Sequence, residues 1–125
     1  MKLSQFEKQQ YLNIETYRKN GQAVKTPVWF TQDGETLHIW TQADSGKAKR
    51  IRANGTVRVT PATASGEPTG EWLNARALAD ESKEAVDYVK KLMTAKYGLM
   101  FHIFGFIGRI RGGSKYTNIR VKLQS

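Results

Sequence analysis

Alternating hydrophobic and polar positions predict that most of the chain forms β-strands. In residues 11–18, Leu12 and Ile14 fall on one side of an extended chain and mostly polar residues fall on the other, which is the pattern of a half-buried strand. Similar patterns give six expected strands, at 11–18, 23–31, 36–42, 56–64, 71–80 and 116–123. Asn-Gly and Asp-Gly dipeptides separate the first three strands and favour tight antiparallel hairpins.

Three further segments are expected to be helical. A short helix is predicted within residues 2–10, and a very basic one after Ser45. A longer helix is predicted after Asp80, because acidic residues lie in its first turn, lysines lie toward its end, and Gly98 is a natural stop. The order of elements implies one mainly β (α+β) domain over residues 1–125, a six-stranded antiparallel barrel with peripheral helices.

The most apolar stretch is residues 99–110 (LMFHIFGFIGRI), which is too short for a bilayer span of about 20 residues. We therefore expect no membrane span, and a helix in the core or at a subunit interface. A helix on a membrane surface is the alternative, given Arg109 and Arg111. The N-terminus lacks the apolar segment of a secretion signal, so a cytoplasmic location is the default expectation.

Composition narrows the possible chemistry. The chain has no cysteine, which excludes disulfides, thiol nucleophiles and cysteine-ligated metals. His38 and His102 are isolated from carboxylates at ligand spacing, which argues against a metal site. The net charge is +9, and residues 46–65 and 88–125 contain basic but no acidic residues. Such a field attracts nucleic acid, an anionic membrane or an acidic cofactor, and composition does not choose among them.

Ser45-Gly46-Lys47 is the best candidate for an anion site. A predicted strand ends at a polar turn here and a basic helix follows. The first N–H groups of a helix lack partners within the helix, and a hydroxyl and a lysine beside them complete a phosphate site. Lys49 and Arg50 would add charge. The alternative is that Ser45 only caps a solvated basic helix.

Pro27 marks a special position in the second expected strand. Proline has no N–H to give to a neighbouring strand, so it indicates an edge or a bulge. Two interpretations remain open, namely an ordinary edge strand and a backbone that faces a ligand. The aromatic residues Tyr17, Trp29, Trp40 and Trp72 could stack on bases of a nucleic acid, although such residues are more often core or interface anchors.

Two longer motifs carry a resemblance to a known family. KTPVWF (25–30), followed by a hairpin and by WTQADSGKAKRIRANGTVRV (40–59), resembles the pyridoxamine 5′-phosphate oxidase-like split β-barrel proteins. TPVWF, SGKAKR, GEPTGEW (66–72) and KYGL (96–99) more narrowly resemble the branch of deazaflavin-dependent oxidoreductases, which use coenzyme F-420. The resemblance extends over residues 11–121.

The resemblance implies a homodimeric split barrel that holds FMN or F-420 in a groove between subunits. The residues that it places around the cofactor phosphate are Trp40, Thr41, Ser45, Gly46 and Lys47, with Lys49 and Arg50 as further anion contacts. The strand along the flavin ring would be Lys25, Thr26, Pro27 and Val28. Phe30 stands where the FMN oxidases carry a second basic residue, which argues against true pyridoxamine phosphate oxidation.

The expected function is hydride transfer between F-420 or FMN and a small organic substrate, with no obligatory catalytic side chain. The basic surplus favours F-420, because its oligoglutamate tail needs several cations. Two alternatives remain, a non-catalytic flavin or deazaflavin carrier and a basic barrel that binds nucleic acid. Under the preferred interpretation the partners are a second copy of the chain and a small-molecule substrate, and no nucleic acid is expected.

Overall fold

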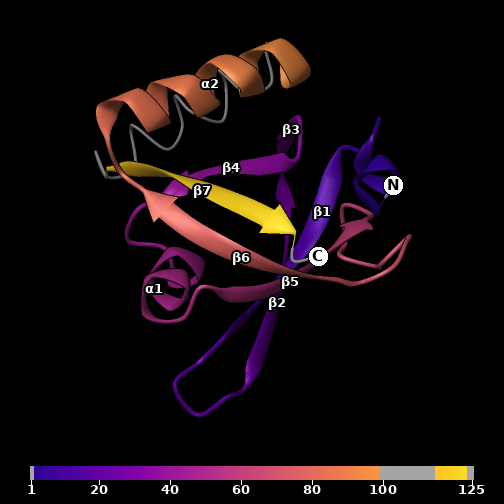
Figure 1. Cartoon of the computed structure of the whole chain (residues 1–125), viewed down its shortest axis with the longest axis vertical. Coiled ribbons are helices and arrows are strands. Elements are labelled where there is room, and N and C mark those ends of the chain that lie inside the picture. The colour runs from indigo at the N-terminus through magenta and orange to yellow at the C-terminus, as the bar shows by residue number, and fades with distance from the viewer. Residues whose placement is uncertain (1, 99–114, 124–125) are drawn as a thin grey trace.

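The computed structural model describes residues 2–98 and 115–123, except for the side chains of residues 2 and 3. An antiparallel sheet curls around the core, and two α-helices lie on it (Figure 1). The strands are β1 (Tyr11–Tyr17), β2 (Ala23–Trp29), β3 (Thr31–Asp33), β4 (Thr36–Gln42), β5 (Thr56–Ala62), β6 (Leu73–Asp80) and β7 (Tyr116–Leu123). The helices are a leading 3-10 helix η1 (Lys2–Phe6), α1 (Gly46–Ala53) and α2 (Lys83–Tyr97).

The strands follow the order β2-β1-β5-β6-β7-β4-β3. All pairings are antiparallel. The last strand, β7, lies between β6 and β4 and thereby joins the N-terminal hairpins into one sheet (Figure 1). The sheet is therefore a curled half-barrel, and the mainly β prediction is confirmed.

The number of strands differs from the prediction, because the expected strand 23–31 is broken into β2 and β3 at Phe30. The Phe30 N–H donates to the hydroxyl of Tyr97 at 3.0 Å, and Lys96 Nζ donates to the Phe30 carbonyl at 2.8 Å. Side chains of α2 thus take both backbone groups of Phe30. The described sheet has seven strands rather than six.

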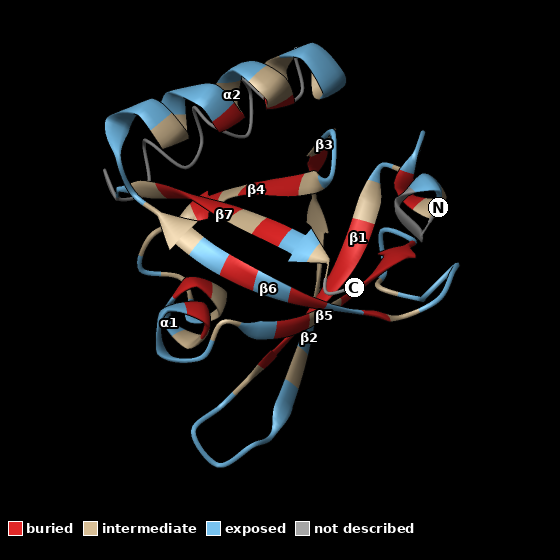
Figure 2. Cartoon of the chain, viewed as in Figure 1, coloured by how far each residue is buried: buried red, intermediate tan, exposed pale blue. Residues whose placement is uncertain are grey.

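The core lies inside the curl of the sheet (Figure 2). It consists of alternate residues of β1, β4, β5, β6 and β7, together with Phe6, Phe30, and Ala48 and Ile51 of α1. Phe6 of η1 packs edge-on against Phe30, with ring centroids 5.8 Å apart. The helix α2 lies on the outer side of the sheet, where Val89 and Met93 are buried against aromatic side chains.

The barrel is split where β2 and β4 approach one another. β2 pairs only with β1, and β3 begins opposite His38, so that residues 39–42 of β4 pair only with β7. β2 and β4 are in contact but are not neighbours in the sheet. Pro27 lies in β2, which confirms the prediction of an edge strand. Whether its backbone serves a ligand remains a prediction.

Two expectations concern regions or copies that the structure does not describe. The apolar segment 99–110 lies outside the described residues. The predicted dimer stays a prediction, because the structure holds one chain. Within 2–98 and 115–123, no helix is both long and apolar enough to cross a membrane.

Candidate functional site

The first turn of α1 begins at Ser45, in the strand-turn-helix arrangement that the sequence predicts. The Ser45 hydroxyl accepts a hydrogen bond from the backbone N–H of Ala48 at 3.3 Å, so Ser45 is the N-cap. A hydroxyl that accepts in this way keeps its own hydrogen available for an anion. The N–H groups of Gly46 and Lys47 begin the helix, and helical N–H groups at this position have no carbonyl partner in the helix.

The Arg50 side chain folds back over this first turn. Its Nε donates to Thr16 Oγ1 of β1 at 2.7 Å. A Cβ atom added to Gly46 would lie 2.8 Å from Arg50 Nη1, closer than real Cβ atoms approach other atoms. Glycine at position 46 therefore leaves the space in which the guanidinium lies against the helix start.

Lys47 and Arg50 have no acidic partner among the described residues, and Arg18 lies near enough for its charge to act on Arg50. Burial, and then the charge of Arg50, lower the pKa of Lys47, while burial, and then the charge of Arg18, lower the pKa of Arg50. In the described ranges, none of the ion pairs within 4.0 Å involves Arg18, Lys47 or Arg50. We call these three residues the cation cluster. Its mutual repulsion makes it a strong attractor of anions.

On the other face of β1, in contrast to the cation cluster, the cations have an acidic partner. Glu15 is only 3% exposed and accepts from Arg58 Nε at 2.8 Å and Nη2 at 3.0 Å. Tyr17 donates to the same carboxylate at 2.6 Å, and Lys25 Nζ lies 3.9 Å from it. The bond from Arg58 is the main reason why the pKa of Glu15 is lowered. Glu15 of β1 thus pairs with Arg58, whereas no acidic residue in the described ranges pairs with the cation cluster.

Lys49 lies apart from the cation cluster. Residues 47 and 50 are on one face of α1, whereas 49 and 52 are on the opposite one, as a helix of 3.6 residues per turn requires. Lys49 and Arg52 line a separate cavity of about 320 Å³ with Asp44, Glu81 and Lys115. Arg52 Nη1 is 2.8 Å from Glu81 Oε1. The structure therefore divides the predicted anion contacts between two places.

The two predicted residues of β4 also face different ways. Trp40 stacks on Tyr116, with ring centroids 4.2 Å apart, and packs on the outer side with Val89 and Met93. Thr41 is buried, 9% exposed, on the opposite side of the strand. The side chains of Trp40 and Thr41 thus cannot contact one ligand from the same face.

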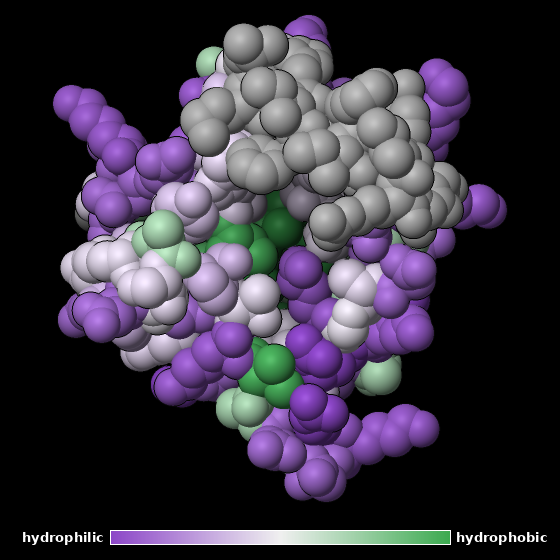
Figure 3. Space-filling view, turned by 180° about the vertical axis from the view of Figure 1, so that it is seen from behind, coloured by the Kyte–Doolittle hydropathy of each residue, from purple (hydrophilic) through white to green (hydrophobic). Residues whose placement is uncertain are grey.

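The predicted ring strand, β2, has one open backbone edge. Thr26, Pro27 and Val28 are half-buried, and Val28 packs against the core. The Pro27 ring lies 3.5 Å from the position that a Cβ of Gly66 would take, so the loop at Gly66 covers its outer side. The edge away from β1 has no strand partner in the described sheet. On the side of the molecule turned away in Figure 1, hydrophobic surface is visible among hydrophilic side chains (Figure 3).

The sequence reasoning missed Arg18 and Thr16. Thr16 lies at the end of β1 and Arg18 directly follows that strand, about thirty residues before α1, and no local pattern links the two segments. The available signal was the position of Arg18, two residues before the Asn-Gly dipeptide of the turn that connects the hairpin strands. Its role depends on the packing of α1 against β1, which only the tertiary structure shows.

No protein-family model matches the sequence, and no curated protein matches it. Solved structures do match in three dimensions. A protein assigned as a pyridoxamine 5′-phosphate oxidase from Listeria innocua superimposes with a TM-score of 0.70 at 15% identity, over 98% of this chain and 90% of that one. HutZ, the heme storage protein from Vibrio cholerae, gives a TM-score of 0.73 at 14% identity, over 99% and 89%.

A third structure, described as an F420 reductase, gives a TM-score of 0.64 at 20% identity, over 98% of this chain and 93% of that one. The fold is the pyridoxamine 5′-phosphate oxidase-like split β-barrel. These identities establish the fold alone, since proteins of this fold include both oxidoreductases and a heme storage protein. The branch suggested by the motifs remains a prediction.

Proposed function

We propose that the chain binds F-420 or FMN at the split between β2 and β4, with the cofactor phosphate at the first turn of α1, and serves hydride transfer to or from a small organic substrate. The observation that carries this proposal is the cation cluster of Arg18, Lys47 and Arg50, which has no acidic partner in the described residues. A phosphate dianion would remove the repulsion among these charges.

The groups around the cluster fit a phosphate. The Ser45 hydroxyl, the N–H groups of Gly46 and Lys47, and the Arg50 guanidinium all surround the helix start. Helix N-termini with such donors are common phosphate sites, and charged donors shorten and strengthen the hydrogen bonds. Gly46 supports the same assignment, because a side chain there would displace the Arg50 guanidinium.

The ring system would lie along the open edge of β2. Alternate residues of 25–28 direct their backbone groups to that edge, the others being bonded to β1, and Pro27 has no N–H to satisfy. Backbone groups at an open edge can bond the polar rim of a flavin or deazaflavin ring while half-buried side chains exclude water. Lys25 would contribute charge only in part, because it already lies 3.9 Å from Glu15.

The bound cofactor would supply the redox chemistry, and the protein would bind and orient it. No described side chain is needed as an acid or base. Among the described residues, no three histidine, aspartate or glutamate side chains are grouped to hold a metal. We further propose that a second copy of the chain completes the groove, as the family resemblance implies.

The choice between F-420 and FMN depends on the second cavity beside α1. An oligoglutamate tail needs cations beyond the phosphate site, and Lys49 and Lys115 line that cavity. Arg52 is less available, because Glu81 pairs with it. Asp44 also lines the cavity, so this preference for F-420 is smaller than the net charge alone suggests.

The test is a titration of the purified protein with FMN, riboflavin and F-420, followed by absorption and fluorescence. Riboflavin lacks the phosphate, so preference for FMN over riboflavin measures the site at α1. We expect that preference to be at least tenfold, and F-420 to bind at least as tightly as FMN. Equal affinity for FMN and riboflavin would overturn the phosphate placement, and absence of binding to any of them would overturn the function. Heme is the control. We expect no heme ligation by His38, because this histidine is only 4% exposed.

A carrier is separated from an enzyme by turnover. Loaded protein that exchanges hydride with a panel of small organic acceptors under anaerobic conditions supports the oxidoreductase. Stable binding with no exchange would leave the carrier alternative. The nucleic-acid alternative predicts a shift of DNA or RNA at low salt that falls steeply as salt increases.

A further inference from the structure

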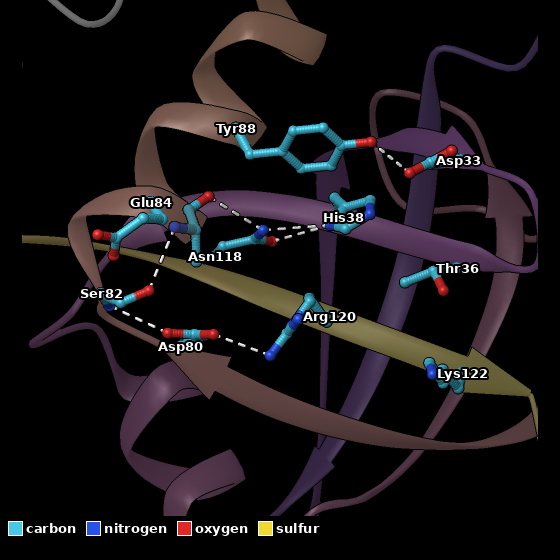
Figure 4. A pocket seen from close by; sticks show the side chains of 11 residues that line it. Asp33, Thr36, His38, Asp80, Ser82, Glu84, Tyr88, Asn118, Arg120 and Lys122 are labelled. Atoms are coloured by element: carbon cyan, nitrogen blue, oxygen red, sulfur yellow. Dashed lines mark hydrogen bonds and ion pairs between the residues drawn. The ribbon is translucent and has the colours of Figure 1, made fainter.

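A cavity of about 550 Å³ lies on the other side of the sheet from the core, beneath α2 (Figure 4). Its floor consists of residues of β4 and β7, and the first turns of α2 form one wall. The end of β6 contributes Asp80. No residue of α1 or β2 lines it, so it is distinct from the proposed cofactor site.

His38 is the most buried ionisable group of this cavity, at 4% exposure. Its Nδ1 lies 3.2 Å from Nδ2 and 3.3 Å from Oδ1 of Asn118, and the same Nδ2 donates to the Ala85 carbonyl at 3.2 Å. Nδ2 has a second hydrogen besides the one given to Ala85, and we assign the tautomer in which His38 Nδ1 accepts it. The ring hydrogen is then on Nε2.

The Nε2 atom of His38 is on the side of the ring away from Asn118 (Figure 4). It makes no hydrogen bond with any described residue. Burial lowers the pKa of His38, which keeps the ring neutral at neutral pH. Nε2 thus offers an N–H group to whatever occupies the cavity.

Two of the three carboxylates that line the cavity, Asp33 and Asp80, are engaged, whereas several donors are not. Asp33 accepts from the Tyr88 hydroxyl. Asp80 accepts from the Ser82 N–H at 3.0 Å and from Arg120 Nη2 at 2.8 Å. In contrast, no hydrogen bond or ion pair in the described chain engages the donors at the other end, namely the Thr36 hydroxyl, Lys122 Nζ and the remaining guanidinium N–H groups of Arg120.

An apolar border lies beside these donors. Tyr88 and Leu78 are 41% and 60% exposed, and they are the large hydrophobic side chains most open to solvent in the described ranges. The Tyr88 ring meets His38 edge-on, with centroids 5.5 Å apart. Leu78 pairs with Arg120 across β6 and β7, on the same face of the sheet. Of these two side chains only Tyr88 lines the cavity, so a flat apolar group would lie against the Tyr88 ring.

We propose that this cavity binds a small aromatic carboxylate, with the carboxylate between His38 Nε2, Thr36 and Lys122 and the ring beside Tyr88. The volume is in the usual range of small-molecule sites. A monoanion suits the site better than a phosphate dianion, because Asp33, Asp80 and Glu84 also line the cavity and repel further negative charge.

Benzoate is the probe, with benzyl alcohol and inorganic phosphate as comparisons, in calorimetry and in ¹⁵N NMR of the histidine rings. We expect one benzoate per chain, a shift of the His38 Nε2 resonance, and at least tenfold weaker binding of benzyl alcohol. Lys122→Gln and Thr36→Val lie at the rim and should each weaken benzoate at least threefold. Lys49→Gln, in the cavity beside α1, is the matched control and should leave benzoate binding unchanged.

His38→Gln tests the central donor, because an amide nitrogen can stand near the position of Nε2, whereas His38→Ala has no donor. Retained affinity in the glutamine variant and loss in the alanine variant support the proposal, provided that both variants give the circular dichroism spectrum of a folded chain. If the alanine variant does not fold, the Lys122 and Thr36 variants decide. Undetectable benzoate binding, phosphate binding as tight as benzoate, or equal effects of the Lys122 and Lys49 variants would each overturn it.

Discussion

Replacing Lys47 by glutamine separates binding of a cofactor phosphate from stability of the fold. The stem of Lys47 is half-buried and its charge has no acidic partner in the described ranges. Glutamine keeps most of the packing and removes the charge. Because burial and Arg50 already lower the pKa of Lys47, the folded protein holds this charge at a cost.

The expected loss of FMN affinity follows from the type of bond removed. A hydrogen bond to a charged group contributes about 1.5–3 kcal/mol, which corresponds to roughly 10- to 150-fold in affinity, since about 1.4 kcal/mol is a factor of ten. The free energy of unfolding should stay the same or increase slightly, because one member of the repelling cation cluster is gone.

The assay is fluorescence titration of FMN and of riboflavin, together with urea unfolding. Lys47→Gln should weaken FMN and leave riboflavin unchanged, so that the two affinities converge. Lys49→Gln is the control, because Lys49 lies on the opposite face of α1 and is exposed. Equal weakening of FMN and riboflavin, or unchanged FMN affinity in Lys47→Gln, would refute the reasoning about the phosphate.

Three further substitutions and one pH titration test other parts of the structure. Gly46→Ala should weaken FMN binding severalfold with little change in stability, since the new Cβ meets only the flexible end of the Arg50 side chain at 2.8 Å. The FMN titration measures this effect, and unchanged FMN affinity would contradict the assigned position of the guanidinium. Glu15→Gln should lower the free energy of unfolding by about 1–3 kcal/mol, because Arg58 loses its partner but is 39% exposed and can hydrate. Asp87→Asn breaks the exposed pair with Lys83 and should change the free energy of unfolding by less than about 0.5 kcal/mol. Similar losses for Glu15→Gln and Asp87→Asn in urea unfolding would contradict the difference between the buried and the exposed carboxylate. Finally, stability should fall as pH decreases below 6.5, because the folded pKa of His38 is lowered and the unfolded chain takes up the proton first; His38→Gln should remove this contribution in denaturant titrations at pH 7.5 and 5.5.

Local patterns were sufficient for much of the fold. Strand alternation and the Asn-Gly and Asp-Gly turns predicted the strands, and Ser45 predicted the start of α1. The same periodicities also bear on the predicted site. Helical spacing alone places Lys47 and Lys49 on different faces of α1, and strand alternation alone places Trp40 and Thr41 on opposite sides of β4. Local geometry therefore indicates that these four side chains do not all face one point, and the cofactor-binding role of each position stays a prediction.

Other features could not have been predicted from local sequence. The break at Phe30 depends on Lys96 and Tyr97, and the cation cluster depends on Arg18, which packing brings near α1. The cavity around His38 arises from β4, β7 and α2, whose register is set by pairing of segments about eighty residues apart. Long-range packing, rather than local preference, decides these positions.

The bonds from α2 to Phe30 also bear on the order in which the site can form. Tyr97 and Lys96 reach Phe30 across 66 or 67 positions of the chain, and the Tyr97 hydroxyl in turn donates to the Gln10 carbonyl at 2.7 Å. Contacts of such sequence separation form late, because closing long loops costs entropy before the contacts compensate for it. The hairpin can pair early, but the elbow that ends β2 and leaves its outer edge open becomes fixed only when α2 docks. Binding at that edge would therefore report the completion of folding and would stabilise the docked helix by mass action.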